Sequence, residues 1–330
     1  MLSFIFRRFL SAIPFFILVS LTVFVIIQLP PGDYVDSWAA QMSASGSTVD
    51  AVMMANERAR LGLDQPMIVQ YVRWISDIVL HGDFGRSFTW NQAVSELIGE
   101  SMGYTVLMTV GSLFLSWMIA LPIGVYSAVK RYSFGDYAFT LISFVGLAIP
   151  PFLLALVLMY LVKEYSGQVL SGLFSEEFQG QNVPWSIGKF VDLCKHLVIP
   201  VIIIGISASA SLIRIMRANL IDQLSQPYVV TARAKGLTER RLLFKYPVRV
   251  ALNPFVSTLG SVLPTLVNGG TTVSIVLSMP TAGQMLYNAL LVQDIYLSGA
   301  LLLLICLLTV VGTLISDILL AILDPRIRMD

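Results

Sequence analysis

Six stretches of the chain contain no charged residue, and they constrain the fold more than any other feature of the sequence. They are residues 9–32, 101–129, 137–162, 197–213, 250–293 and 295–316. Together they hold 162 of the 330 residues, yet all 41 charged side chains lie outside them. A helix that crosses a bilayer needs about 20 apolar residues, and a charge at its centre costs about 3 kcal/mol. The pattern predicts an all-α, polytopic membrane protein and excludes a soluble domain and a nucleic-acid-binding protein.

The uncharged stretches predict six transmembrane helices. We expect them at about residues 9–29, 103–129, 137–162, 197–216, 253–278 and 296–320. The first could instead be a signal peptide, but its apolar run is longer than a signal core, so we expect a retained span. The fourth is the shortest, and Arg214 would have to extend from its end toward the membrane surface.

The distribution of charge between the connecting segments predicts the orientation. With six spans, the segments on the side of the termini carry 14 basic and 6 acidic residues, and the opposite side carries 7 and 14. The positive-inside rule therefore places both termini in the cytoplasm. Two spans within residues 250–293 would put Arg326 and Arg328 opposite Arg7 and Arg8, so we prefer one span there, followed by a turn at residues 278–283.

This layout divides the chain into three regions. Residues 1–29 form the N-terminal tail and first span, residues 30–100 an extracytoplasmic loop region, and residues 101–330 a core with five spans. In the loop region, Ser43 to Ser47 reads as flexible. Residues 66–80 have the apolar spacing of an amphipathic helix, which would lie on the membrane or cover a pore mouth, or simply pack.

The chain lacks the residues that metal binding, ATP hydrolysis, secondary transport and intramembrane catalysis require. The chain has two cysteines and two histidines, without the spacing of a metal site, so we expect no metal. No G-x-x-x-x-G-K-[ST] loop is present, so ATP hydrolysis by this chain is not expected. A self-contained channel or secondary transporter would favour charged residues or an inverted repeat within the spans, and an intramembrane enzyme needs a paired nucleophile and base. Within the predicted spans the only charged residues, Arg214 and Asp317, lie near the ends, and none of the other features is present.

The longest inner loop, residues 217–249, contains the signals of a helical hairpin. Pro227 can start a helix and Gly236 can end it in a left-handed conformation. Thr238 can cap a second helix, which Pro247 would stop. Small residues on the first limb would let another protein approach the backbone closely, although an ordinary solvated basic loop explains the same composition.

Residues Tyr228 to Leu237 resemble the cytoplasmic coupling motif of ABC importer permeases, in the variant of the dipeptide/oligopeptide permease family. Three further stretches resemble that family in the same order along the chain. They are Pro31-Gly32-Asp33, Leu61 to Pro66 with Gly82 to Ser87, and Asp324 to Arg328. The resemblance covers nearly the whole chain and implies the type I ABC importer permease fold.

In that family the hairpin docks into a groove on an ATP-hydrolysing subunit, whose closure switches the permease from outward to inward access. The residues that the resemblance places at this contact are Tyr228, Thr231, Ala232, Arg233, Ala234, Lys235, Gly236, Leu237, Glu239 and Arg240. The implied partners are a second homologous permease subunit, two ATP-binding subunits, an extracytoplasmic substrate-binding protein and the lipid bilayer. ATP and Mg²⁺ would bind to the partner subunits, with no cofactor in this chain. The implied location is the cytoplasmic membrane of a bacterium or archaeon.

The translocation path and its substrate are less clearly indicated. An uncharged polar path would be lined by Asn268, Thr271, Thr272 and Ser274. Ordinary packing between helices accounts for polar residues at these positions equally well. Many family members carry an acid where Ser274 stands, and residues 277–293 are closer to members associated with oligosaccharide or glycoside uptake. We therefore expect oligopeptides or dipeptides as substrates, with oligosaccharides as the alternative.

Overall fold

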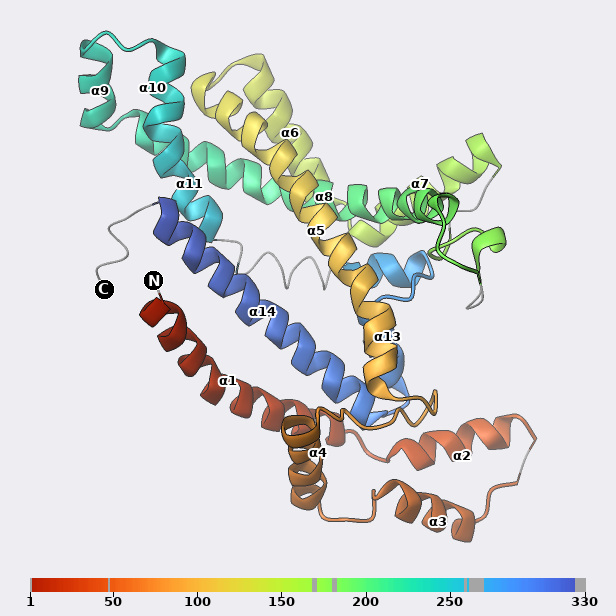
Figure 1. The fold of residues 1–330 in the computed structure, drawn as a ribbon. Coiled ribbons are helices and arrows are strands. Elements are labelled where there is room, and N and C mark those ends of the chain that lie inside the picture. Colours follow the sequence, from red (N-terminus) through yellow and green to blue (C-terminus); the bar gives the residue numbers. More distant parts are fainter. Residues whose placement is uncertain are drawn as a thin grey trace. The chain divides into compact units, whose positions relative to one another are not determined.

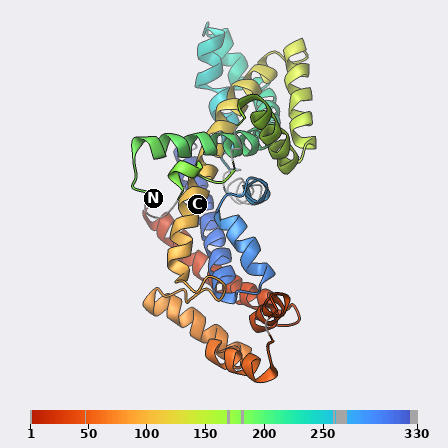
Figure 2. The same ribbon diagram turned by 90° about the vertical axis from the view of Figure 1, so that its right-hand side faces the viewer.

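The computed structural model describes residues 2–46, 48–167, 171–179, 183–257, 260 and 270–323, and within these every regular element is a helix. The chain forms two compact units. The N-terminal unit contains residues 2–104 and 281–307, and the core unit contains residues 105–280 and 308–330. Figure 1 and Figure 2 show the helices.

The elements lie in the following order along the chain. They are α1 (Leu2–Gln28), α2 (Tyr34–Ala44), α3 (Ala51–Leu61), α4 (Met67–His81), α5 (Val94–Val129), α6 (Phe134–Ala148), α7 (Pro151–Ser166), the short 3-10 helix η1 (Glu176–Phe178), α8 (Ile187–Leu224), α9 (Pro227–Ala234), α10 (Glu239–Lys245), α11 (Pro247–Ser257), α13 (Ala282–Leu291) and α14 (Ile295–Leu323).

Three helices among the described residues are long and apolar enough to cross a membrane by themselves. They are α5, α8 and α14, and they confirm the spans predicted at 103–129, 197–216 and 296–320. α1 covers the first predicted span as one helix of 27 residues. The fifth predicted span runs from α11 through residues 261–269, which lie outside the described residues. These findings establish a polytopic membrane protein of the all-α class.

The span predicted at 137–162 is broken near its middle. α6 and α7 are separate helices that meet at an angle of 97°. Ile149 and Pro150, which each precede a proline, both have extended backbones, with ψ of 117° and 137°. A residue before proline avoids the helical conformation because the proline ring clashes with its backbone. The Pro150-Pro151 pair therefore breaks the span, whereas Pro122 and Pro200 lie inside continuous helices.

α8 is much longer than the 17 uncharged residues of its sequence suggested. It has 38 residues and includes ten residues that we had assigned to an outer loop, Ile187 to His196. Ser186 starts the helix by accepting a hydrogen bond from the Lys189 backbone N–H. Charged side chains at both ends are accommodated because the helix extends beyond its apolar middle.

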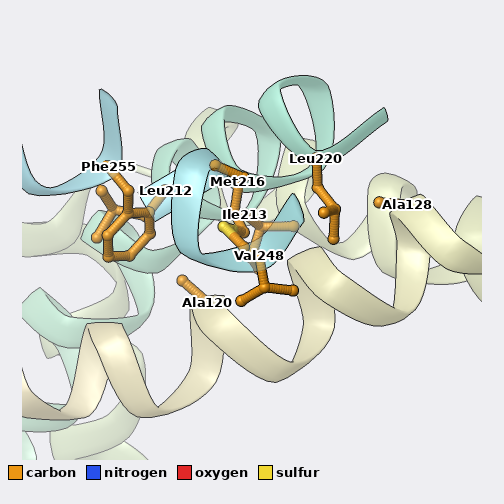
Figure 3. Close-up of a cluster of buried hydrophobic side chains, with 9 residues drawn as sticks. Ala120, Ala128, Leu212, Ile213, Met216, Leu220, Val248 and Phe255 are labelled. Carbon is orange, nitrogen blue, oxygen red and sulfur yellow. The ribbon is translucent and has the colours of Figure 1, made fainter. Parts of the chain in front are cut away.

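The core unit is held together where α5, α8 and α11 meet. Figure 3 shows the buried cluster that they form. Its members are Ala120, Ala128, Leu212, Ile213, Met216, Leu220, Val248, Ala251 and Phe255. Trp117 packs edge-on against Phe255, with ring centroids 4.9 Å apart. Small residues on α5 let the α8 backbone approach, which is the usual way that helices pack in membranes.

We expect Gly124→Ala to destabilise the protein by about 1–3 kcal/mol, because it overpacks this junction. A Cβ at Gly124 would lie 2.7 Å from the Met216 Cβ and 3.2 Å from the Ile213 carbonyl oxygen. Thermal unfolding of the purified protein in detergent measures the loss. The matched control is Gly146→Ala in α6, whose Cβ would meet only the Ala210 Cβ, at 3.9 Å. Equal unfolding temperatures for the two variants would contradict this account.

In the N-terminal unit, α4 packs one face against α1 and α14. Trp74 is 2% exposed, and its ring lies 5.7 Å from the Phe24 ring of α1. A Cβ at Gly299 of α14 would lie 2.8 Å from the Trp74 ring, so glycine is needed there. The helix predicted at 66–80 is confirmed. Its other face exposes Ile68 and Val79, and its contact with a membrane or pore mouth stays a prediction.

Two segments are more helical than the sequence indicated. Ser43 and Ala44, which we expected to be flexible, are the last residues of α2, and Ser45 and Gly46 form the turn that follows. After the predicted turn at 278–283, the chain forms α13 rather than an irregular outer segment. α13 packs into the N-terminal unit because Ala282 and Ala289 are buried against α5 and α14 residues such as Leu97 and Leu301.

Candidate functional site

The inner loop 217–249 folds as the predicted helical hairpin. Pro227 is the first residue of α9, which ends at Ala234, and Lys235 caps it. Gly236 follows with φ of +77°, the left-handed conformation that other residues rarely adopt. Its amide donates to the Arg233 carbonyl at 3.0 Å. α10 begins after Thr238, whose side chain makes no capping hydrogen bond, and it ends at Lys245, before Pro247 as predicted. Pro247 is then the first residue of α11.

The hairpin has a small hydrophobic core of its own. Val229 and Ala232 of α9 are buried against Leu242 of α10, and Leu237 and Tyr246 pack around them. Ala232 is only 7% exposed, so its methyl group stabilises the hairpin instead of offering a contact surface. This placement sets Ala232 and Leu237 apart from the other residues that the resemblance assigned to docking. In Figure 1, α9 and α10 are seen as two limbs joined at one end.

The opposite face of α9 is exposed and carries short side chains. At 100° per residue, Val230, Thr231 and Ala234 lie opposite the buried Val229 and Ala232, and all three are exposed. The Thr231 hydroxyl donates to the Pro227 carbonyl at 2.9 Å, so it is satisfied within the helix. The sequence had not indicated Val230, although its side chain is 56% exposed in the middle of this face. We call Val230, Thr231 and Ala234 the short-side-chain face.

Polar and charged residues border this face. The Tyr228 hydroxyl donates to the Gln223 side chain at 2.8 Å. Arg233 reaches from the first limb to Glu239 on the second, with Nε 2.6 Å from Oε1, and it lowers the pKa of Glu239. Both charged groups are exposed, so this ion pair contributes little stability and mainly fixes how the limbs meet. Lys235 and Arg240 are exposed beside it.

A buried ion pair ties the helix that carries the hairpin to the start of α6. Arg217 of α8 lies ten residues before Pro227 and donates to both carboxylate oxygens of Asp136, each at 2.8 Å. Asp136 is 2% exposed and also accepts the Tyr132 backbone N–H at 2.9 Å. The sequence showed only two charges next to predicted spans. Their pairing connects the α5–α6 turn to the α8 segment that leads into the hairpin.

The predicted path residues that the structure describes differ in burial. Asn268 lies outside the described residues. Ser274 is completely buried, Thr272 is exposed, and Thr271 is intermediate, on a helical turn that spans residues 270–276. Nearby, Gly270 approaches the Met108 side chain, which a Cβ would meet at 3.4 Å. A role in translocation therefore stays a prediction for these residues.

The motifs that resembled a first outer loop have structural roles in the N-terminal unit. Asp33 caps α2 and binds Arg58, with 2.6 Å between Oδ2 and Nε. Burial alone would raise the pKa of Asp33, but Arg58 and backbone N–H groups outweigh it and lower the pKa. Ser87 donates to Asp294 at 2.6 Å, and Asp294 also accepts the Leu297 backbone N–H in the first turn of α14. No sequence pattern indicated Asp294, which is completely buried.

Two family models match the chain. The model described as "Binding-protein-dependent transport system inner membrane component" matches residues 120–329. That of the N-terminal part of such membrane components matches residues 1–109. The first model includes the hairpin and its supporting helices, and together the two cover almost the whole chain.

Curated relatives match over their full length. The oligopeptide transport system permease protein AppB of Bacillus subtilis is 35% identical over 329 residues, which cover 99% of this chain and 100% of that one. The dipeptide transport system permease protein DppB of Escherichia coli K12 is 30% identical, with 99% of each chain covered. The glutathione transport system permease protein GsiC of Salmonella paratyphi A is 31% identical, again with 99% of each covered.

A solved structure shows the same fold. It is an inward-facing form of the MetNI methionine ABC transporter, with a TM-score of 0.52 and 18% sequence identity. The match covers 70% of this chain and 97% of that chain. It shows the type I ABC importer permease fold, as the sequence resemblance implied.

Proposed function

Because the chain belongs to the family of binding-protein-dependent transport system inner membrane components, we propose that it forms half of the translocation pathway of a peptide importer. Its substrates are oligopeptides or dipeptides, the class named for the relatives described above. A second, homologous permease subunit supplies the other half. An extracytoplasmic binding protein delivers the peptide, and the chain itself carries out no chemical reaction.

The hairpin carries this proposal. A helix pair with its own buried core moves as a unit, and the short-side-chain face lets a partner approach the α9 backbone closely. Separate ATPase subunits, which bind ATP and Mg²⁺, dock on this face in the cytoplasm. A docked partner can shift a two-state pore only by binding its two states with different affinities. The hairpin is joined to the spans through α8, and the Arg217–Asp136 pair joins α8 to α6. A change in how the ATPase binds the hairpin can therefore move these helices.

The orientation follows from the basic residues. The hairpin loop and the termini carry most of the lysine and arginine, so both termini and the hairpin lie in the cytoplasm. The N-terminal unit's α2, α3 and α4 then lie on the outer side, where the binding protein docks. The chain is thus a multi-pass protein of a prokaryotic cytoplasmic membrane.

Reconstitution of the complete importer tests the proposal. The permease pair, both ATPase subunits and the binding protein are assembled in proteoliposomes, and ATP hydrolysis and uptake are measured with di-, tri- and pentapeptides and with cello- and xylo-oligosaccharides. We expect peptides to stimulate hydrolysis and to accumulate inside. Stimulation by oligosaccharides alone would replace the substrate class with the alternative that residues 277–293 suggested. Transport by this chain without ATPase subunits would overturn the proposed mechanism.

A further inference from the structure

An apolar groove lies on the core unit, between the end of α5 and the junction of α10 with α11. Its volume is about 520 Å³, within the usual range for small-ligand sites. α5 contributes Leu121, Val125 and Val129, and the other wall includes Leu243, Phe244 and Val248. Phe244 is 58% exposed, and Val129 is 45% exposed. The groove thus offers aliphatic and aromatic walls that no described residue of the core unit covers.

Positive charge marks the end of this groove. Lys130, the residue after α5, lines it, and its ammonium group makes no hydrogen bond or ion pair with any described residue. Lys245, the last residue of α10, directly follows the lining residue Phe244 and only stacks over the Tyr246 ring, 5.3 Å from its centroid. Lys130 is therefore a cation at the end of α5 with no anionic partner among the described residues, and Lys245 is a second one, next in sequence to a lining residue.

The combination selects one kind of occupant. A partner helix seated along the groove would cover Lys130, and burying an unpaired ammonium group is costly. A phospholipid fits both the apolar walls and the positive charge. Its acyl chain packs against the walls, and its phosphate pairs with the lysine ammonium groups. Basic pockets beside transmembrane helices on the cytoplasmic side are typical sites for anionic headgroups. We infer that this groove is a binding site for an anionic phospholipid of the inner leaflet, an assignment that rests on the proposed orientation.

Lipid retention by the purified, fully assembled importer tests the inference. The complex is exchanged into equal amounts of phosphatidylglycerol and phosphatidylcholine with identical palmitoyl-oleoyl chains, and bound lipids are counted by native mass spectrometry. A cation next to an anionic headgroup contributes about fivefold in affinity. We expect preferential retention of phosphatidylglycerol, a loss of about fivefold in that preference for Lys130→Gln, and a further loss for Lys130→Gln with Lys245→Gln.

Two further variants separate the groove from general charge effects. Val129→Trp fills the groove and should lower retention of both lipids at this site. Lys163→Gln removes an exposed lysine at the end of α7 and should leave retention unchanged. Equal retention of the two lipids by the unmodified complex would overturn the inference, as would a partner-subunit helix seated in the groove of a solved assembly.

The result is independent of whether the chain transports peptides. Bound lipids are counted in the absence of substrate and ATP. If the uptake assay fails, the lipid counts therefore still show whether the groove binds phosphatidylglycerol. Thiol labelling of a Lys130→Cys variant, in which the two free cysteines Cys194 and Cys306 are replaced by serine, from either side of the membrane tests the orientation alone. If residue 130 is labelled only from the outer side, the assignment of the groove to the inner leaflet is wrong. The permease assignment is tested separately by uptake.

Discussion

Ala234→Trp is expected to lower peptide uptake by the assembled importer at least about tenfold, with the protein still present in the membrane. Ala234 is exposed on the short-side-chain face of α9, away from the hairpin core formed by Val229, Ala232 and Leu242. An indole at this position holds a docking partner away from the helix backbone without disturbing the fold. Loss of about 1.4 kcal/mol of docking energy is sufficient for a tenfold effect.

Three measurements separate a docking defect from misfolding. Peptide-stimulated ATP hydrolysis and co-purification of the ATPase subunits should fall together with uptake, while the unfolding temperature of the permease stays unchanged. Ala40→Trp, which adds the same ring to an exposed alanine of α2 in the N-terminal unit, is the matched control for ATPase co-purification and unfolding temperature. It is not a control for uptake, because α2 belongs to the proposed docking side of the binding protein. Normal uptake and normal ATPase binding by Ala234→Trp would show that this face is not the coupling surface.

The second large effect is expected from Arg217→Met. It leaves the buried Asp136 carboxylate without its guanidinium partner. Breaking a fully buried ion pair costs about 3 kcal/mol or more, and because the Arg217 side chain is 28% exposed we expect a loss of about 2 kcal/mol here. The unfolding temperature should fall, and uptake should fall further than ATP hydrolysis, because α8 is no longer fixed to the α5–α6 turn. Thermal unfolding, together with the ratio of peptide transported to ATP hydrolysed, measures both consequences.

A double variant shows whether the pairing itself matters. Asp136→Asn with Arg217→Met removes both charges but keeps a side-chain oxygen for the Tyr132 backbone N–H. We expect it to recover most of the lost stability, since no uncompensated charge remains buried. If the double variant is as unstable as the sum of the two single variants, the two residues do not interact, and the connection between α8 and α6 must lie elsewhere.

Local sequence signals predicted the hairpin well, because its shape depends on backbone preferences of single residues. Pro227 fixes a helix start and Gly236 adopts a positive φ, and both act within a few residues of where they stand. The same kind of local signal is present at Pro150-Pro151, where two successive extended residues produce a 97° break. Helix ends extending past the apolar stretch, as in α8, depend on capping by Ser186 and on packing of the charged residues.

The sequence by itself determined the class of the protein, the spans α5, α8 and α14, and the helical hairpin of α9 and α10. This was possible because transfer of apolar residues into a bilayer and local dihedral preferences depend on residues close together in the chain. Only the tertiary structure decided that Ala232 points into the hairpin, that Arg217 pairs with Asp136 across 81 positions, and that Ser87 meets Asp294 across 207. Such pairings follow from which helix faces pack together, and one amino-acid sequence carries no local signal for that choice.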